Sequence, residues 1–159
     1  MRPKLAESDQ MTIEEFLEYT GTRPDDEKWE LIEGIAVMQA SPTGIHQTIA
    51  ANIVGELRAH RRRQSADWHP LLGIGTMAPI SPNSLPEPDV MVKQHPASSS
   101  RISDDALVMF EVLSPSNSKS DLRWRLRVYS SVPNCQHYVT VDQSRLGVVR
   151  GLALGELDG

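Results

Sequence analysis

The chain has 159 residues, of which 39% are hydrophobic and 23% are charged, and its formal net charge is -5 at pH 7. This length predicts one domain over residues 1–159, and the composition is ordinary for a globular protein. No apolar run approaches the roughly 18 residues that a membrane-spanning helix needs, which excludes a membrane protein. The acidic balance argues against a nucleic-acid-binding surface over the whole molecule, because such surfaces neutralise phosphates with Lys and Arg.

The cellular location is indicated by what the sequence lacks. The N-terminal sequence MRPKLAESDQ is charged and has no apolar stretch of the kind found in a secretory signal. The single cysteine, Cys135, cannot form an intramolecular disulfide. No cluster of Cys and His has the spacing of zinc ligands. We therefore expect a cytoplasmic protein.

The first predicted elements are a short helix and a hairpin. The helix covers residues 12–19, where Thr12 can cap its start and Glu15 can reach back to the backbone of Thr12, the pattern of a capping box. Residues 29–39, with the sequence WELIEGIAVMQ, contain two extended runs. These runs meet at Glu33 and the glycine after it, which is typical of a tight hairpin turn.

The longest helix is predicted over residues 41–63. A serine followed by proline is a good helix start, and apolar residues recur every four positions, at Ile45, Ile49, Ile53 and Leu57. The basic C-terminal end of this segment would complement the negative end of the helix dipole.

The second half of the chain consists mainly of predicted strands. Residues 66–80 are extended but interrupted by two glycines, and a proline-rich loop follows. The remaining elements are strands at 89–92 and 106–113, a helix at 121–131, strands at 137–142 and 146–150, and a short C-terminal tail at 151–159. This mixed order predicts an α/β (α+β) domain, with its core over about residues 11–150, in which helices pack on a β-sheet.

Two carboxylates in this half are placed for chemistry. Asp89 lies at the mouth of the strand at 89–92, and Glu111 lies inside the otherwise apolar strand at 106–113. If these strands are neighbours, their side chains can approach to about 5 Å, so both carboxylates could converge on one cation. Mg²⁺ is typically held by one or two carboxylates. Such an ion can polarise a phosphodiester and lower the pKa of a bound water, which is the chemistry of nucleic-acid hydrolysis.

Four ordered motifs extend this interpretation: WELIEG, SPTGIH, EPDVMV and MFEVLSPSNSKSDLRWRLRVYSSVPNCQHYVTVD. Together they resemble the predicted restriction endonucleases of the Uma type, a branch of the PD-(D/E)XK nuclease superfamily. The resemblance covers roughly residues 11–150. It implies a restriction-endonuclease-like mixed β-sheet flanked by helices, and an Mg²⁺- or Mn²⁺-dependent endonuclease that hydrolyses DNA.

The resemblance also implies a set of site residues. Asp89 and Glu111 match the metal-binding acids of the family, and Glu30 and His46 match two further polar positions of its site. The roles that follow are metal binding for Asp89 and Glu111 and assistance for Glu30 and His46, with His46 either supporting a metal-binding residue or acting as a general acid/base group.

One position departs from the superfamily pattern. The superfamily lysine would come two residues after Glu111, where this chain has Leu113. The family instead offers a lysine from the following helix, and Arg125 matches that position. Arg can stabilise the charge that builds on a scissile phosphate, but it cannot lose its proton to act as a base.

Alternatives remain open at this point. Glu111 could be a structural carboxylate paired with Arg125. The chain could be a catalytically degenerate nuclease-fold protein that binds nucleic acid or a protein partner without cleavage, or a purely structural domain, and a homodimer fits all of these readings. If DNA binds, the basic clusters supply the contact candidates Arg61, Arg62, Arg63 and Arg123, although such clusters are often solvated faces.

Overall fold

A computed structural model of the chain describes residues 10–143 and 149–153. The helices among these residues are α1 (Ile13–Gly21), α2 (Gly44–Gln64) and α3 (Lys119–Ser130). The strands are β1 (Trp29–Ile32), β2 (Ile35–Met38), β3 (His69–Leu72), β4 (Gly75–Thr76), β5 (Val90–Lys93), β6 (Ile102–Ser103), β7 (Ala106–Leu113), β8 (His137–Asp142) and β9 (Val149–Ala153). No helix in the described part of the chain is long and apolar enough to cross a membrane.

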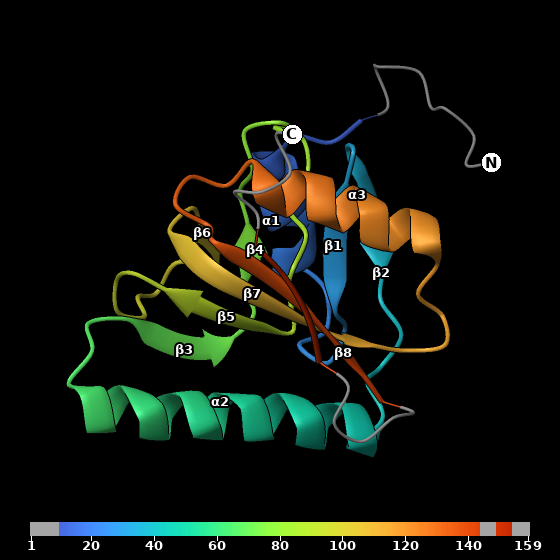
Figure 1. Cartoon of the computed structure of the whole chain (residues 1–159). Helices are drawn as coiled ribbons and strands as arrows, with labels where there is room; N and C mark the ends of the chain where they lie inside the picture. The colour runs from blue at the N-terminus through green and yellow to red at the C-terminus, as the bar shows by residue number, and fades with distance from the viewer. Residues whose placement is uncertain (1–9, 144–148, 154–159) are drawn as a thin grey trace.

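The central sheet has five strands in the order β3-β5-β7-β8-β9. β7 and β8 run parallel, and the other neighbouring pairs run antiparallel, so the sheet is mixed as the sequence predicted. Helix α2 lies along one face of this sheet and α3 lies on the other (Figure 1). The predicted architecture, a mixed sheet with flanking helices, is confirmed.

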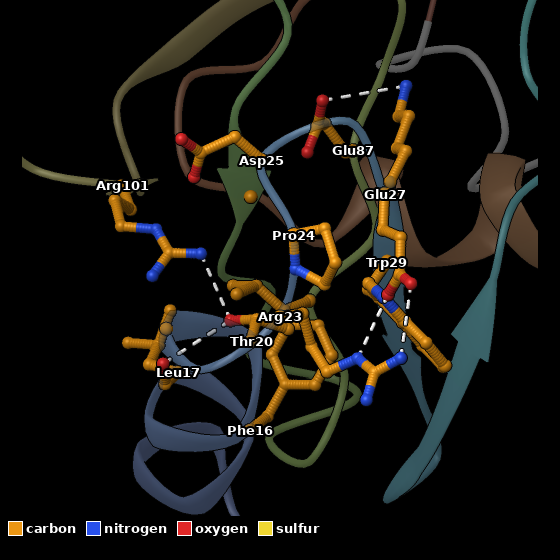
Figure 2. A pocket seen from close by; sticks show the side chains of 14 residues that line it. Phe16, Leu17, Thr20, Arg23, Pro24, Asp25, Glu27, Trp29, Glu87 and Arg101 are labelled. Carbon is orange, nitrogen blue, oxygen red and sulfur yellow. Dashed lines mark hydrogen bonds and ion pairs between the residues drawn. The ribbon is translucent and has the colours of Figure 1, made fainter.

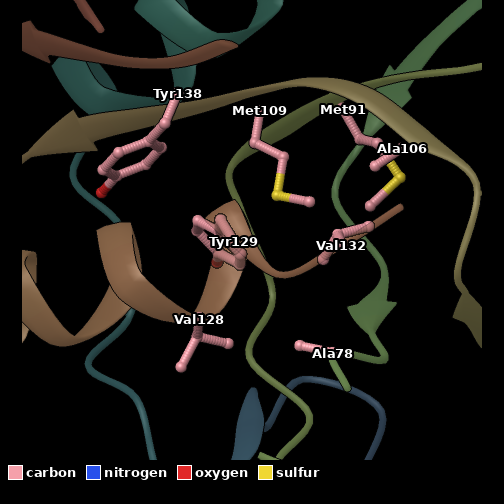
Figure 3. Packing of buried hydrophobic residues seen from close by; sticks show 8 residues of the cluster. All are labelled: Ala78, Met91, Ala106, Met109, Val128, Tyr129, Val132 and Tyr138. Carbon is pink, nitrogen blue, oxygen red and sulfur yellow. The ribbon is translucent and has the colours of Figure 1, made fainter. Parts of the chain in front are cut away.

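The two faces of β5 and β7 supply two separate hydrophobic clusters. Val90 and Val112 pack with residues of α2. Met91 and Met109, one position out of phase, pack with Tyr129 and other residues of α3 (Figure 3). Because successive side chains of a strand point to opposite faces, this alternation holds one helix on each side of the sheet.

The β1–β2 hairpin is joined to the rest of the fold by its first strand. Its turn has positive φ at Glu33 (50°) and Gly34 (80°), the backbone of a type I′ turn, as the sequence predicted. The amide of Leu85 donates a hydrogen bond of 2.7 Å to the carbonyl of Leu31. This contact fixes β1, and with it Glu30, against the segment that leads into β5.

Most predicted elements are confirmed, and the capping box of Thr12 and Glu15 is complete. The predicted start of the long helix was wrong: Thr43 caps the helix, which begins at Gly44 and not near Ser41. Its first apolar position, Ile45, is 64% exposed, because only the later turns pack on the sheet.

The C-terminal predictions are partly testable. The last strand is described at Val149–Ala153 instead of 146–150, and residues 146–148 lie outside the described part. Of the predicted tail at 151–159, residues 154–159 also lie outside it. The single-domain organisation stays a prediction.

Candidate active site

The site begins where β5 and β7 pair. The antiparallel register places Val90 opposite Phe110, so its continuation by one residue sets Asp89 opposite Glu111. The carboxylate of Asp89 accepts a hydrogen bond of 2.7 Å from the backbone amide of Val112. The two strands are neighbours in the sheet as predicted, and their pairing brings both carboxylates to one end of the strand pair.

Arg125 of α3 joins this end of the sheet to the hairpin. Its guanidinium binds Glu30 in a bidentate manner, with Nη1–Oε1 at 3.0 Å and Nη2–Oε2 at 2.6 Å. The side chain of Glu30 is only 2% exposed, and it also accepts a hydrogen bond of 2.7 Å from the amide of Glu87. A buried carboxylate needs such partners, since an unpaired charge is costly in a protein interior.

The same guanidinium contacts Glu111. Nη1 of Arg125 lies 3.1 Å from Oε1 of Glu111 and donates a hydrogen bond of 3.1 Å to the hydroxyl of Tyr129. That hydroxyl in turn donates to Glu111 over 3.3 Å. Arg125 and Tyr129 are four residues apart on α3, so they lie one above the other on a single helix face. The sequence-based alternative, an Arg125–Glu111 ion pair, is thus present in the structure.

His46 approaches from the opposite side of the sheet. It lies in the first turn of α2, where its amide donates to the capping hydroxyl of Thr43. Its Nε2 is 3.2 Å from Oδ2 of Asp89, and both side chains are largely buried. The N-terminal end of α2 lies at the side of the sheet where β7 ends (Figure 1), so this contact follows from the fold.

The charge balance of the site is negative. Burial raises the pKa of Glu111 to about 8, the charge of Arg125 opposes this rise, and the charges of Asp89 and Glu30 and a hydrogen bond with Asp89 add to it. Burial also raises the pKa of Glu87. Glu111 therefore takes up a proton more readily than an ordinary carboxylate, at a place where a cation would also be stabilised.

All five predicted site residues line one cavity of about 780 Å³: Glu30, His46, Asp89, Glu111 and Arg125. The Arg125–Glu111 ion pair does not fill this space. The cavity is large enough for a hydrated ion together with part of a substrate.

The donor set fits one type of metal ion. Among the described residues, no group of three or more His, Cys, Asp and Glu side chains is arranged as a complete metal site. Mg²⁺ needs no such group, because it is usually bound by one or two carboxylates together with waters and substrate phosphates. Asp89 and Glu111, which the strand register sets opposite each other, supply two carboxylates beside an open cavity.

The predicted nucleic-acid contacts lie elsewhere. Arg61, Arg62 and Arg63 are in the last turn of α2. The helix rise of about 1.5 Å per residue puts them roughly 20–25 Å from His46. Arg123 is exposed, and two helix positions separate it from the inward-facing Arg125. The structure does not bring these four arginines to the cavity, and their contact with DNA stays a prediction.

Three residues of the site were not predicted. Tyr129 contacts Glu111, Glu87 donates its amide to Glu30, and Lys28 pairs with Glu87 at 3.5 Å. Spacing gave a usable signal in each case. Tyr129 follows Arg125 by one helical turn. Glu87 precedes Asp89, and Lys28 precedes Glu30, by two positions, a spacing that sets side chains on one side of an extended chain.

A second cavity of about 660 Å³ lies next to the first and is lined by α1 and the start of the hairpin. Figure 2 shows Glu87 at one side of it, with its ion pair drawn as a dashed line, and Arg101 at another side. Lys28 and Glu87 line both cavities, so this pair lies at their boundary.

A contrasting carboxylate lies at the other end of the same strand pair. Asp105 is 3.3 Å from Nζ of Lys93 and accepts hydrogen bonds from the amide of His95 at 3.0 Å and from the hydroxyl of Ser103. Burial alone would raise the pKa of Asp105, but these donors and the charge of Lys93 lower it well below its ordinary value. Asp105 is therefore a fully satisfied structural carboxylate.

Comparison with known proteins supports the sequence-based resemblance. A family model described as "Uma2: Putative restriction endonuclease" matches residues 13–150. A crystal structure described as "a putative nuclease belonging to DUF820 from Anabaena variabilis ATCC 29413" is similar over 90% of this chain and 84% of that chain, with a TM-score of 0.67. The two sequences are 18% identical, so this similarity shows a shared fold. A comparison with curated proteins finds no significant match.

Proposed function

The chain belongs to the Uma2 "putative restriction endonuclease" family, and from this premise we propose that it is a metal-dependent endonuclease that hydrolyses DNA phosphodiester bonds. The observation that carries the proposal is the meeting of Asp89 and Glu111 beside an open cavity, with more negative charge than the neighbouring cations balance. A structural ion pair does not need this surplus, whereas a site for a divalent cation does.

In the proposed site, Asp89 and Glu111 would hold Mg²⁺ or Mn²⁺. When bound, such an ion polarises the phosphodiester and lowers the pKa of a water molecule. Arg125 holds Glu111 and Glu30 in fixed positions through its ion pairs, and Tyr129 orients Glu111 through its hydroxyl. These contacts keep Glu111 in place before the substrate arrives, and the backbone amide of Val112 does the same for Asp89.

His46 is the proposed acid/base group. Its imidazole lines the cavity and is oriented by Asp89, as a proton-carrying histidine usually is by a carboxylate. In the proposed reaction, water attacks the phosphorus, and the bond from phosphorus to the sugar oxygen of the leaving strand breaks. His46 accepts the proton that the attacking water loses, and the leaving oxygen takes up a proton from solvent.

The test is incubation with supercoiled plasmid DNA and Mg²⁺ or Mn²⁺. We expect nicked and linear products, with rates lowered at least about 100-fold in Asp89→Ala and in Glu111→Ala. Asp105→Asn is the matched control, because it changes a buried carboxylate at the other end of the same strands and should keep the activity. Cleavage that persists in both site variants would contradict the proposal.

A second candidate function is supported by the Arg125–Glu111 ion pair and by Leu113. In this reading the protein binds nucleic acid or a protein partner without cutting it. Salt-dependent DNA binding with no metal-dependent product would favour this candidate. The cytoplasmic location and the homodimer stay predictions.

A further inference from the structure

The catalytic cavity contains few cations for a site that must accept a phosphate. Four carboxylates line it, from Glu30, Glu87, Asp89 and Glu111. Among the described residues, the permanently charged cations that line it are Lys28 and Arg125. DNA brings further negative charge, and besides a bound metal ion these two side chains are the permanent cations of the described lining that could contact its phosphates.

Arg125 is already committed to protein groups. Its Nη atoms bind both oxygens of Glu30, Glu111 and the hydroxyl of Tyr129, and its side chain is 13% exposed. If Arg125 turned to a phosphate, Glu30 would remain buried without its partner. Leaving a buried charge unpaired is strongly destabilising, so this exchange is unfavourable.

Lys28 has no comparable commitment. Its ammonium has three donors, and its ion pair with Glu87 is long, with Nζ–Oε1 at 3.5 Å. The side chain is 34% exposed, and an exposed ion pair of this kind contributes little to stability. A phosphate could therefore replace Glu87 as the partner of Lys28 at little cost.

The position of the pair is fixed close to the catalytic acids. The amide of Glu87 is bound to Glu30, and Glu87 precedes Asp89 by two residues. The charge of Asp89 contributes to the raised pKa of Glu87, although burial is the main cause. Lys28 thus lies at the edge of the catalytic cavity and not on a remote surface.

We propose that Lys28 is a catalytic residue that contacts a phosphate of the DNA strand in the cavity, while Arg125 only positions the acids. Lys28 would thereby supply the ammonium group that is missing at Leu113. This inference rests on the proposed function, because it assumes that DNA enters this cavity.

The test compares two substitutions that break the same ion pair, Lys28→Gln and Glu87→Gln. Binding of a short DNA duplex in EDTA is measured by fluorescence anisotropy over a series of KCl concentrations. We expect Lys28→Gln to weaken binding several-fold and to reduce the slope of log K against log salt by about 0.9, the value for one lost phosphate contact. Glu87→Gln should tighten binding, because it removes a negative charge and frees Lys28.

Cleavage with Mg²⁺ gives the second measurement. We expect kcat/KM to fall roughly 10- to 100-fold in Lys28→Gln and to return largely to the wild-type value in Lys28→Arg. Arg127→Gln is the control, since Arg127 is exposed on α3 and does not line the cavity.

The outcomes separate this inference from the proposed function. If the pair is only structural, both substitutions act in the same direction and leave the salt slope unchanged, which would overturn the inference even for an active nuclease. If the wild type binds DNA without cleaving it, hydrolysis is refuted, while the salt slope still decides the role of Lys28. If the wild type does not bind DNA, the inference is overturned.

Discussion

The two ends of the β5–β7 pair each hold a mostly buried carboxylate beside a cation, yet they behave in opposite ways. At one end Lys93 and neighbouring donors lower the pKa of Asp105. At the other end the pKa of Glu111 is raised to about 8, although Arg125 is 3.1 Å away. An ion pair alone therefore does not lower the pKa of a largely buried carboxylate.

The difference lies in the surrounding charges. Asp105 is surrounded by donors, from Ser103, His95 and Lys93. Glu111 shares its arginine with Glu30 and also lies beside Asp89. The first end is balanced, whereas the second keeps a negative surplus that a proton or a metal ion can neutralise. Such local destabilisation is common at functional sites.

The largest expected difference between the two ends is the loss of stability when the cation at each end is replaced. Arg125→Met should lower the free energy of unfolding by about 3–5 kcal/mol, because it leaves Glu30 buried and unpaired. Lys93→Met should cost less, about 1–2 kcal/mol, since Asp105 keeps its hydrogen bonds from Ser103 and His95. Urea denaturation followed by circular dichroism measures both. Equal losses at the two ends would show that the charge surroundings do not differ as described.

The sequence could predict those features of the two ends that depend on local patterns in the chain. The strand at 106–113 was predicted to the residue, because an apolar run between polar segments is a local pattern. The pairing of Asp89 with Glu111 followed from two strands close in the chain. The Asp105 end was not predicted, since two of its donors, His95 and Ser103, come from a loop and from the two-residue β6, which have no periodic pattern.

The role of Arg125 shows a different limit. Its partner Glu30 is 95 residues away, and the bond depends on how the hairpin and α3 pack in three dimensions. The motif placed both residues at the site, but it did not show that they bind each other. The predicted start of α2 was wrong for a simpler reason. Ser41 and Thr43 both have side chains that can cap a helix, and only packing decides between them.

The second prediction uses pH to separate the two ends in metal-free protein. The folded-state pKa of Glu111 lies above its ordinary value of 4.5, so the proton stabilises the folded state and this contribution is lost as pH rises towards about 8. We expect the free energy of unfolding to fall by about 2 kcal/mol between pH 6 and 8, and Glu111→Gln to remove this fall. The measurement is urea denaturation in EDTA at several pH values.

The contribution of Asp105 to stability changes with pH in the opposite direction. Its folded-state pKa lies below the ordinary value of 3.8, so its contribution is complete above that pH and is lost only as pH falls through the folded-state pKa. Asp105→Asn should therefore alter the acid limb of the stability curve and leave the slope between pH 6 and 8 intact. If the free energy of unfolding of Glu111→Gln still falls between pH 6 and 8, a group other than Glu111 causes the fall.

The smallest expected effect is stabilisation by Mg²⁺. At a concentration about ten times its Kd, a ligand that binds only the folded state adds about 1.4 kcal/mol, which for a chain of this size raises Tm by about 4 °C. Binding requires Glu111 to lose its proton, so the shift should be larger at pH 8.5 than at pH 6.5. Differential scanning fluorimetry should find the shift in the wild type and in Asp105→Asn, but not in Glu111→Gln or Asp89→Asn. An equal shift in all four proteins would mean that Mg²⁺ binds away from the negative surplus, and the contrast between the two ends would then have no part in metal binding.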